Sequence, residues 1–213
     1  MSAQQPAAPP FTVLLVCTGN ICRSAFAERL GRAFLAEIMG DDALAVRLVS
    51  AGTRAVVDSA MHPHSALVLG GYGAEAGDFR ARQLVEGMAA DADLTLTMTR
   101  DHRREVLRYA PRALARTFTL REAADLVRLL GDSRPGGEEL TERARSLVRE
   151  MAARRHLRHS DADDDVRDPI GHPVDVHEEV GEAIAEALLP VLRRIADLRQ
   201  PDAADAPAEQ SAE

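Results

Sequence analysis

Eight consecutive residues near the amino terminus, Cys17 to Ser24 (CTGNICRS), place a thiol, a guanidinium and small polar side chains within one short segment. An apolar run precedes this segment and a helical pattern of apolar residues follows it, so it should be a loop between a strand and a helix. The first turn of a helix offers unpaired N–H groups and the positive end of the helix dipole. The sequence therefore predicts an anion site, of the size of a phosphate, at this loop.

Each residue type in the loop suits phosphate chemistry. Gly19 and Asn20 tolerate positive φ, which lets the backbone turn its amides toward an anion. Arg23 offers a planar fork for two phosphate oxygens. The helix dipole and Arg23 favour the thiolate form of Cys17, and the hydroxyl of Ser24 can donate a hydrogen bond to it. Such a thiolate can attack phosphorus and form a phosphocysteine that water then hydrolyses.

Strand-like and helix-like segments alternate along the chain, which indicates a doubly wound α/β fold with a parallel sheet. The predicted strands are 11–16, 46–52, 93–98 and 116–120. The first helices are predicted at 24–40, at 63–69 behind a cap at Ser59 or His62, and at 100–110 behind a cap at Thr99. The carboxyl ends of such strands are the usual ligand site, so the fold itself would carry the loop to a crevice.

The second half of the chain predicts more helix. Residues 121–130 and 138–157 have helical patterns on either side of a turn at 131–137, and an acidic loop follows at 161–165. We interpret about 121–165 as a helical insertion in a domain spanning 11–199. The last helix should start at Asp175, because Asp175 and Glu178 resemble a capping box, and Pro190 should kink it.

Composition narrows the class of protein. The net charge of −8 argues against nucleic acid as a general partner. All 26 basic residues are arginine, which by itself indicates no function. The apolar run at 11–16 is too short for a signal segment, and no stretch reaches membrane-spanning length. We therefore expect a cytoplasmic protein with no membrane partner. The ends, 1–10 and 200–213, are predicted to be flexible tails, the second of them acidic.

The segment VCTGNICRSAFAE (16–28) resembles the signature of the low-molecular-weight protein tyrosine phosphatases. The resemblance continues in family order through SAGT (50–53), ARQL (81–84), DLTLTM (93–98) and Asp168-Pro169. It spans nearly the whole chain outside the tails and the predicted insertion. It implies a four-stranded parallel sheet flanked by helices, with the phosphate loop between the first strand and the first helix.

The resemblance also implies roles for individual residues. Cys17 is the nucleophile, Arg23 binds phosphate and Asp168 is the general acid, while Asn20 braces the loop and Ser24 assists the thiolate. General acid catalysis supports the same role for Asp168, since a phenolate leaving group benefits from a proton delivered by a carboxylic acid. The alternative for Asp168 is a plain Asp-Pro turn.

Several positions depart from the family pattern. Ala25 replaces the proline that usually follows the signature serine, and Phe79 replaces a histidine that supports the loop, for which Arg82 is a predicted substitute. Val56 and Ile170 stand where the family usually carries aromatic residues. The predicted substrate-binding set is therefore the loop with two aliphatic walls: Thr18, Gly19, Asn20, Ile21, Cys22, Ser24, Val56 and Ile170.

Other polar clusters are predicted to be structural. We interpret the histidine pairs (His62 and His64, His156 and His159, His172 and His177) as surface residues, and predict no metal site and no cofactor. The four aspartates at 161 and 163–165 are interpreted as a solvated loop, with Asp165 as a fallback acid. The arginines of the second predicted helix are interpreted as a solvated face, with a lid or a partner surface as the alternative: Arg143, Arg145, Arg149, Arg154, Arg155 and Arg158.

The leading hypothesis is hydrolysis of a phosphomonoester, on a phosphotyrosine protein or a small phosphate ester, with modest preference for phosphotyrosine because the aromatic walls are missing. One alternative is arsenate reduction, which would need an external thiol because no cysteine follows Cys22. A second is a non-hydrolysing phosphate or redox sensor, against which Cys17 and Asp168 count. Cys17 and Cys22 could also lie close enough for a disulfide, which predicts reversible oxidation. The sequence does not indicate an oligomeric state.

Overall fold

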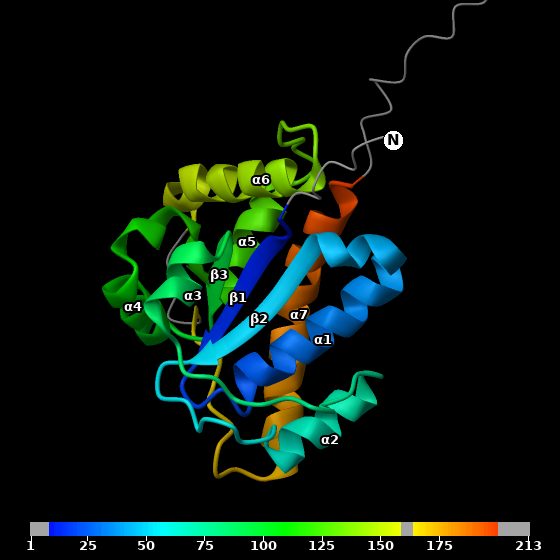
Figure 1. The fold of residues 1–213 in the computed structure, drawn as a ribbon, viewed down its shortest axis with the longest axis vertical. Coiled ribbons are helices and arrows are strands. Elements are labelled where there is room, and N and C mark those ends of the chain that lie inside the picture. The colour runs from blue at the N-terminus through cyan, green and yellow to red at the C-terminus, as the bar shows by residue number, and fades with distance from the viewer. Residues whose placement is uncertain (1–8, 159–163, 200–213) are drawn as a thin grey trace, which may run out of the picture.

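The computed structural model describes residues 9–158 and 164–199. Its centre is a parallel sheet of four strands: β1 (Phe11–Cys17), β2 (Val46–Gly52), β3 (Leu94–Thr97) and β4 (Thr117–Thr119). The strands are ordered β2-β1-β3-β4, and Figure 1 shows the first three of these side by side. Strand β1 pairs with β2 along its whole length, from Phe11 opposite Val46 to Cys17 opposite Gly52. The predicted doubly wound α/β class is confirmed, and all four strands lie within a few residues of their predicted positions.

Helices cover both faces of the sheet. The first face carries α1 (Arg23–Met39), α2 (Pro63–Gly71), α5 (Leu120–Leu130) and α7 (Val174–Asp197), and α1 and α2 both pack along α7 (Figure 1). The other face carries α3 (Glu86–Asp91) and α4 (Arg100–Tyr109). Alternate residues of β1 enter the two cores, Leu15 on the α1 side and Leu14 and Val16 on the α3 side. A strand buried on both faces explains the uninterrupted apolar run at 11–16.

Local capping explains several helix starts. Thr99 accepts a hydrogen bond from the backbone N–H of His102, which confirms the predicted cap of α4, and His62 caps α2 by accepting from the N–H of His64. The predicted capping box at Asp175 is wrong. Helix α7 begins at Val174 behind Pro173, and no side chain caps it, because Asp175 binds the N–H of its neighbour Val176 instead. The six-residue helix α3 and the 3₁₀ turns at Gly40–Ala45, Pro111–Arg116 and Arg155–Leu157 were not predicted.

Helix α6 (Leu140–Arg154) crosses the end of the sheet at which the strands begin, away from the end where Cys17 lies (Figure 1). Two of the arginines that were predicted to form a solvated face instead bind the body of the protein. Arg145 of α6 pairs with Asp93 just before β3 at 2.8 Å, and Arg155, the residue after α6, pairs with Glu122 at 2.7 Å while lying over the ring of Phe118. The interpretation is wrong for these two residues, whereas Arg149 is exposed and Arg154 pairs with Glu150 within the helix. Helix α6 lies far from the phosphate loop and does not form a lid over it.

No helix among the described residues is long and apolar enough to cross a membrane. The predicted tails fall almost entirely on residues 1–8 and 200–213, which lie outside the described part of the chain. The domain limits and the insertion at about 121–165 stay predictions.

Candidate active site

The loop predicted to bind phosphate starts at the last residue of β1 and ends where α1 begins. The Cys17 sulfur lies 2.9 Å from the Ser24 hydroxyl oxygen and accepts a hydrogen bond from the backbone N–H of Asn20 at 3.3 Å. Asn20 has a φ of 55°, as predicted, whereas Gly19 does not have positive φ, so only one of the two residues uses the left-handed region. The loop thus curls back over the sulfur through Asn20.

The Asn20 side chain connects the loop to its surroundings. Its amide nitrogen donates to the hydroxyls of Ser24 and Ser50, both at 2.8 Å, and its carbonyl oxygen accepts from the backbone N–H of Arg82 at 2.8 Å. Asn20 is fully buried, so these three bonds satisfy an amide that would otherwise destabilise the fold. Arg82 therefore reaches the loop through its backbone rather than its side chain.

A buried carboxylate lies behind this network. Glu28 is 2% exposed and accepts from the Ser50 hydroxyl at 2.5 Å, while the guanidinium groups of Arg82 and Arg32 pair with it at 2.8 and 2.6 Å. Sequence reasoning missed Ser50 and Glu28, although both lie inside the motifs SAGT and CRSAFAE. Phe79, at the position of the family histidine, is buried and lies under the Arg29 guanidinium.

The motif at 50–53 acts through backbone contacts. The N–H groups of Thr53 and Arg54 donate to the carbonyls of Cys17 and Thr18, both at 2.9 Å, so β2 continues alongside the loop. A Cβ atom at Gly52 would lie 2.4 Å from the Thr18 carbonyl oxygen, which leaves no space for a side chain. Gln83 holds the same segment by accepting from the Ala55 N–H at 3.0 Å and donating to the Thr53 carbonyl at 3.1 Å.

Arg23 and Asp168 meet at the mouth of the loop. The Arg23 guanidinium is buried and pairs with one Asp168 carboxylate oxygen at 2.5 Å, and it also donates to the Val166 carbonyl at 3.0 Å. The other Asp168 oxygen accepts from the N–H of Ile170 at 3.3 Å, and the Asp168 side chain is 42% exposed. The structure thus brings together Cys17, Arg23 and Asp168. Arg23 and Asp168 are 145 residues apart in the sequence.

A cavity of about 210 Å³ opens above Cys17. Its walls come from the loop and from two further segments: Cys17, Thr18, Gly19, Ile21, Cys22, Arg23, Arg54, Val56, Asp168 and Ile170. Val56 and Ile170 are each 48% exposed and stand on the rim, where they were predicted as walls. Among the described residues, no aromatic side chain lines this cavity. Arg54, which was not predicted, lines it together with an adjoining polar groove beside α4.

His102 in α4 is a further residue that the sequence did not reveal. One ring nitrogen lies 2.8 Å from the Thr18 hydroxyl and the other lies 2.8 Å from the Thr99 hydroxyl, so the ring links the loop to the start of α4. Burial, with the charge of Arg23, lowers the pKa of His102 to about 4. The imidazole is therefore neutral at physiological pH.

The aspartates before Asp168 are not a uniform solvated loop. Asp164 is 4% exposed and pairs with Arg158, which corrects the prediction. Asp165 accepts from the Arg100 N–H at 2.8 Å at the start of α4 and does not line the cavity, so it does not serve as a fallback acid. Asp161 and Asp163 lie outside the described residues.

The histidine interpretation is wrong in one place. His62, His64 and His177 come together, and the rings of His62 and His177 stack with centroids 4.7 Å apart. His177 is 2% exposed rather than a surface residue. Cys22 lies beside them, and burial raises the pKa of its thiol to about 11, so it is a neutral thiol next to the catalytic loop.

Comparison with known proteins agrees with this geometry. Residues 12–129 match the family described as low molecular weight phosphotyrosine protein phosphatase. The probable low molecular weight protein-tyrosine-phosphatase AmsI of Erwinia amylovora is 35% identical over 107 residues, which cover 50% of this chain and 69% of that protein. A protein-arginine-phosphatase of Geobacillus stearothermophilus is 34% identical over 113 residues, which cover 53% of this chain and 71% of that protein.

Solved structures show the same fold. The crystal structure of Erwinia amylovora tyrosine phosphatase AmsI superposes with a TM-score of 0.62 at 24% identity, covering 90% of this chain and 97% of that one. The low molecular weight protein tyrosine phosphatase from T. tengcongensis gives a TM-score of 0.62 at 26% identity, covering 86% and 99%. Because the family match at residues 12–129 spans more than half of the chain, the chain belongs to the low molecular weight phosphotyrosine protein phosphatases.

Proposed function

We propose that the chain hydrolyses phosphotyrosine in proteins through a cysteinyl-phosphate on Cys17. Phosphoester hydrolysis by a cysteine nucleophile is the activity of the family to which the chain belongs. The observation that supports Cys17 most strongly is its surroundings: the sulfur lies at the base of the loop, contacted by the Ser24 hydroxyl and the Asn20 N–H. Both donors stabilise negative charge on sulfur.

Arg23 would bind the phosphate, and Asp168 would transfer protons in both steps of the reaction. A bound phosphate would take the guanidinium hydrogens of Arg23 that now bind Asp168, and Asp168 would then be free to turn toward the leaving oxygen. The Cys17 sulfur forms a bond to phosphorus, the bond from phosphorus to the phenolic oxygen breaks, and Asp168 gives its proton to that oxygen. In the second step Asp168 takes a proton from water, the water oxygen bonds to phosphorus, and the thiolate leaves with release of phosphate.

The cavity walls support an apolar substrate group next to the phosphate. Ile21, Val56 and Ile170 are aliphatic, and Arg54 adds a positive charge at the rim. A phenyl ring can lie between such walls, although without the roughly 0.5–1.5 kcal/mol that ring stacking adds. Phosphoarginine is the second candidate, since one relative is named a protein-arginine-phosphatase. Its charged guanidinium would have to lie between apolar walls and beside Arg54, which favours the neutral phenyl ring.

Three finer points belong to the same proposal. We propose a cytoplasmic location, because a nucleophilic thiol has to stay reduced.

We propose that the groove beside α4, lined by Arg54, Arg104 and His102, receives the peptide on one side of the phosphotyrosine. The disulfide between Cys17 and Cys22 stays a prediction, and a neutral Cys22 thiol would form it slowly.

A substrate panel tests the proposal. Phosphotyrosine, phosphoserine and phosphoarginine peptides are compared with aryl and sugar phosphates by kcat/KM, in the wild type and in Val56→Tyr. We expect aryl phosphates and phosphotyrosine to lead by about 10-fold or less over other monoesters, and V56Y to raise the preference for phosphotyrosine several-fold. Faster turnover of phosphoarginine than of phosphotyrosine would contradict the assignment.

A further inference from the structure

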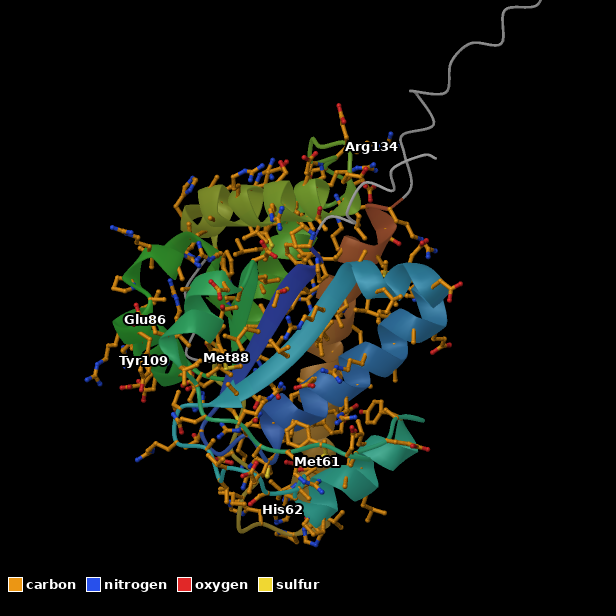
Figure 2. The ribbon with its side chains drawn as sticks, viewed as in Figure 1. Met61, His62, Glu86, Met88, Tyr109 and Arg134 are labelled. Carbon is orange, nitrogen blue, oxygen red and sulfur yellow. The ribbon has the colours of Figure 1, made fainter. Side chains whose placement is uncertain are left out.

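Cys22 of the phosphate loop gathers with three histidines that have no role in the proposed reaction: His62, His64 and His177. Three separate segments supply them, namely the end of the loop, the residues that start α2, and the first turns of α7. The segments touch through their backbones, because the N–H of His62 donates to the Ile21 carbonyl at 2.8 Å. In Figure 2, His62 lies beside the start of α2, at the end of the molecule that carries the loop.

One ligand atom from each of Cys22, His62 and His177 lies within 4.8 Å of the other two. The donor atoms around a tetrahedral zinc ion are roughly 3.3–3.8 Å apart, so the side chains need to move by only on the order of 1 Å to close on an ion. Cys22 and His177 are buried and His62 is half-buried. Such a site would be shielded from solvent on most sides.

The hydrogen bonding of His177 points to a missing ligand. Its Nδ1 atom lies 2.9 Å from the Ser65 hydroxyl, which orients the ring. Its Nε2 atom is buried and makes no hydrogen bond of normal geometry among the described residues, although the Pro169 backbone lies near the ring. A buried polar atom without a partner is uncommon and costs roughly 1–3 kcal/mol, and coordination to a metal would satisfy it. A metal-binding histidine usually has its second nitrogen held in this way.

The types of donor atom also favour one class of metal ion. Nitrogen and sulfur donors select zinc and similar ions, whereas calcium and magnesium prefer oxygen.

We propose that Cys22, His62 and His177 form a binding site for a thiophilic divalent transition-metal ion such as Zn²⁺. The ion would bind the Cys22 thiolate, with the thiol proton released to solvent, and the two imidazoles. His64, whose Nδ1 atom is also buried without a hydrogen-bond partner, or a water molecule would complete the tetrahedron. The ion would tie the residue before Arg23 to α2 and α7, and it would keep Cys22 from reacting with Cys17.

Cobalt provides the test, because a thiolate bound to Co²⁺ gives a charge-transfer absorption band in the near ultraviolet. The experiment uses the full chain carrying Cys17→Ser, which leaves Cys22 as its one cysteine. After treatment with a chelator, C17S is titrated with Co²⁺ and then with Zn²⁺. We expect a thiolate band that Zn²⁺ abolishes at one equivalent. Absence of the band in folded C17S overturns the proposal without the need for any further variant.

Two matched substitutions in the same background locate the site. His177→Asn keeps an amide near Ser65 but removes the Nε2 ligand, and it should weaken Zn²⁺ binding by about 100-fold or more. His172→Asn, in an exposed position five residues away, should leave the affinity unchanged. Equal affinity in the two variants, with folding checked by circular dichroism, would place the metal elsewhere and overturn the proposal.

Discussion

At the carboxyl end of the sheet, polar and charged side chains are buried and converge on Cys17, whereas at the amino end they pair with one another around α6. Asn20, Ser24 and Glu28 are each at most 2% exposed. Arg145, in contrast, is 39% exposed where it pairs with Asp93. Burial makes the first set of contacts expensive to break, while solvent screens the second set. We therefore expect the arginine-rich helix to contribute less to the chemistry than the buried set around Cys17.

The largest effect should come from the centre of the buried set. Cys17→Ser should lower kcat by at least about 10⁴-fold, because a serine hydroxyl is not ionised there and is a poor nucleophile. Phosphate should still bind to this variant, since the loop amides and Arg23 remain. Steady-state kinetics and calorimetric titration with phosphate measure the two properties. Turnover near that of the wild type would refute the role of Cys17.

Next comes Asp168 at the exposed mouth of the same site. Asp168→Ala should lower kcat by roughly 10²-fold to 10⁴-fold for phosphotyrosine peptides, whose leaving group needs a proton. The loss should be much smaller for aryl phosphates with strongly activated leaving groups. Comparison of kcat across a series of aryl phosphates measures the difference. Equal losses along the series would show that another residue is the acid.

His102 gives an effect on stability that depends on pH. Its pKa is about 4 in the folded chain and near 6.5 when unfolded, so the folded state binds fewer protons. Its contribution is therefore complete above pH 6.5 and is lost as the pH falls toward 4, by up to about 3 kcal/mol. Urea unfolding of the wild type should weaken more steeply over this range than that of His102→Gln. His62 and His177 titrate in both proteins, so the difference isolates His102.

The smallest effect should come from the amino end. Arg145→Gln removes one half-exposed ion pair and should reduce the free energy of unfolding by about 1 kcal/mol or less, with kcat/KM unchanged within about twofold. Glu28→Gln is the buried counterpart at the other end, and it should cost more because it leaves two guanidinium groups without a full partner. If R145Q lowered kcat/KM as much as E28Q, the proposed difference between the two ends of the sheet would be refuted.

The sequence predicted the fold, which the structure confirms, and the residues that meet at the loop, because both predictions depend on local patterns. The apolar run at 11–16, the loop Cys17 to Ser24 and the cap Thr99 are contiguous signals, and each has one dominant physical reading. Asp168 was identified through its Asp-Pro pair and the family resemblance. Its pairing with Arg23, however, depends on the tertiary fold.

The missed residues share a different property. Ser50, Glu28 and His102 are brought to the loop from three elements, and nothing in their spacing along the chain indicates that they meet. The same holds for Cys22, His62 and His177, which were interpreted separately as a loop residue and as surface histidines. Contacts between distant segments follow from the packing of α2 and α7, which periodicity alone does not specify.

The rim and the base of the cavity are constrained to very different degrees, and this bears on how the enzyme can diverge. Gly52 admits no side chain, since a Cβ atom there would lie 2.4 Å from the Thr18 carbonyl oxygen. Val56 and Ile170, in contrast, are half-exposed on the rim. Substitutions at the rim can therefore change which phosphorylated molecule is accepted while the phosphate-binding geometry is inherited intact. In this scaffold, substrate specificity can change through substitutions at the rim, whereas the reaction depends on the constrained base of the cavity.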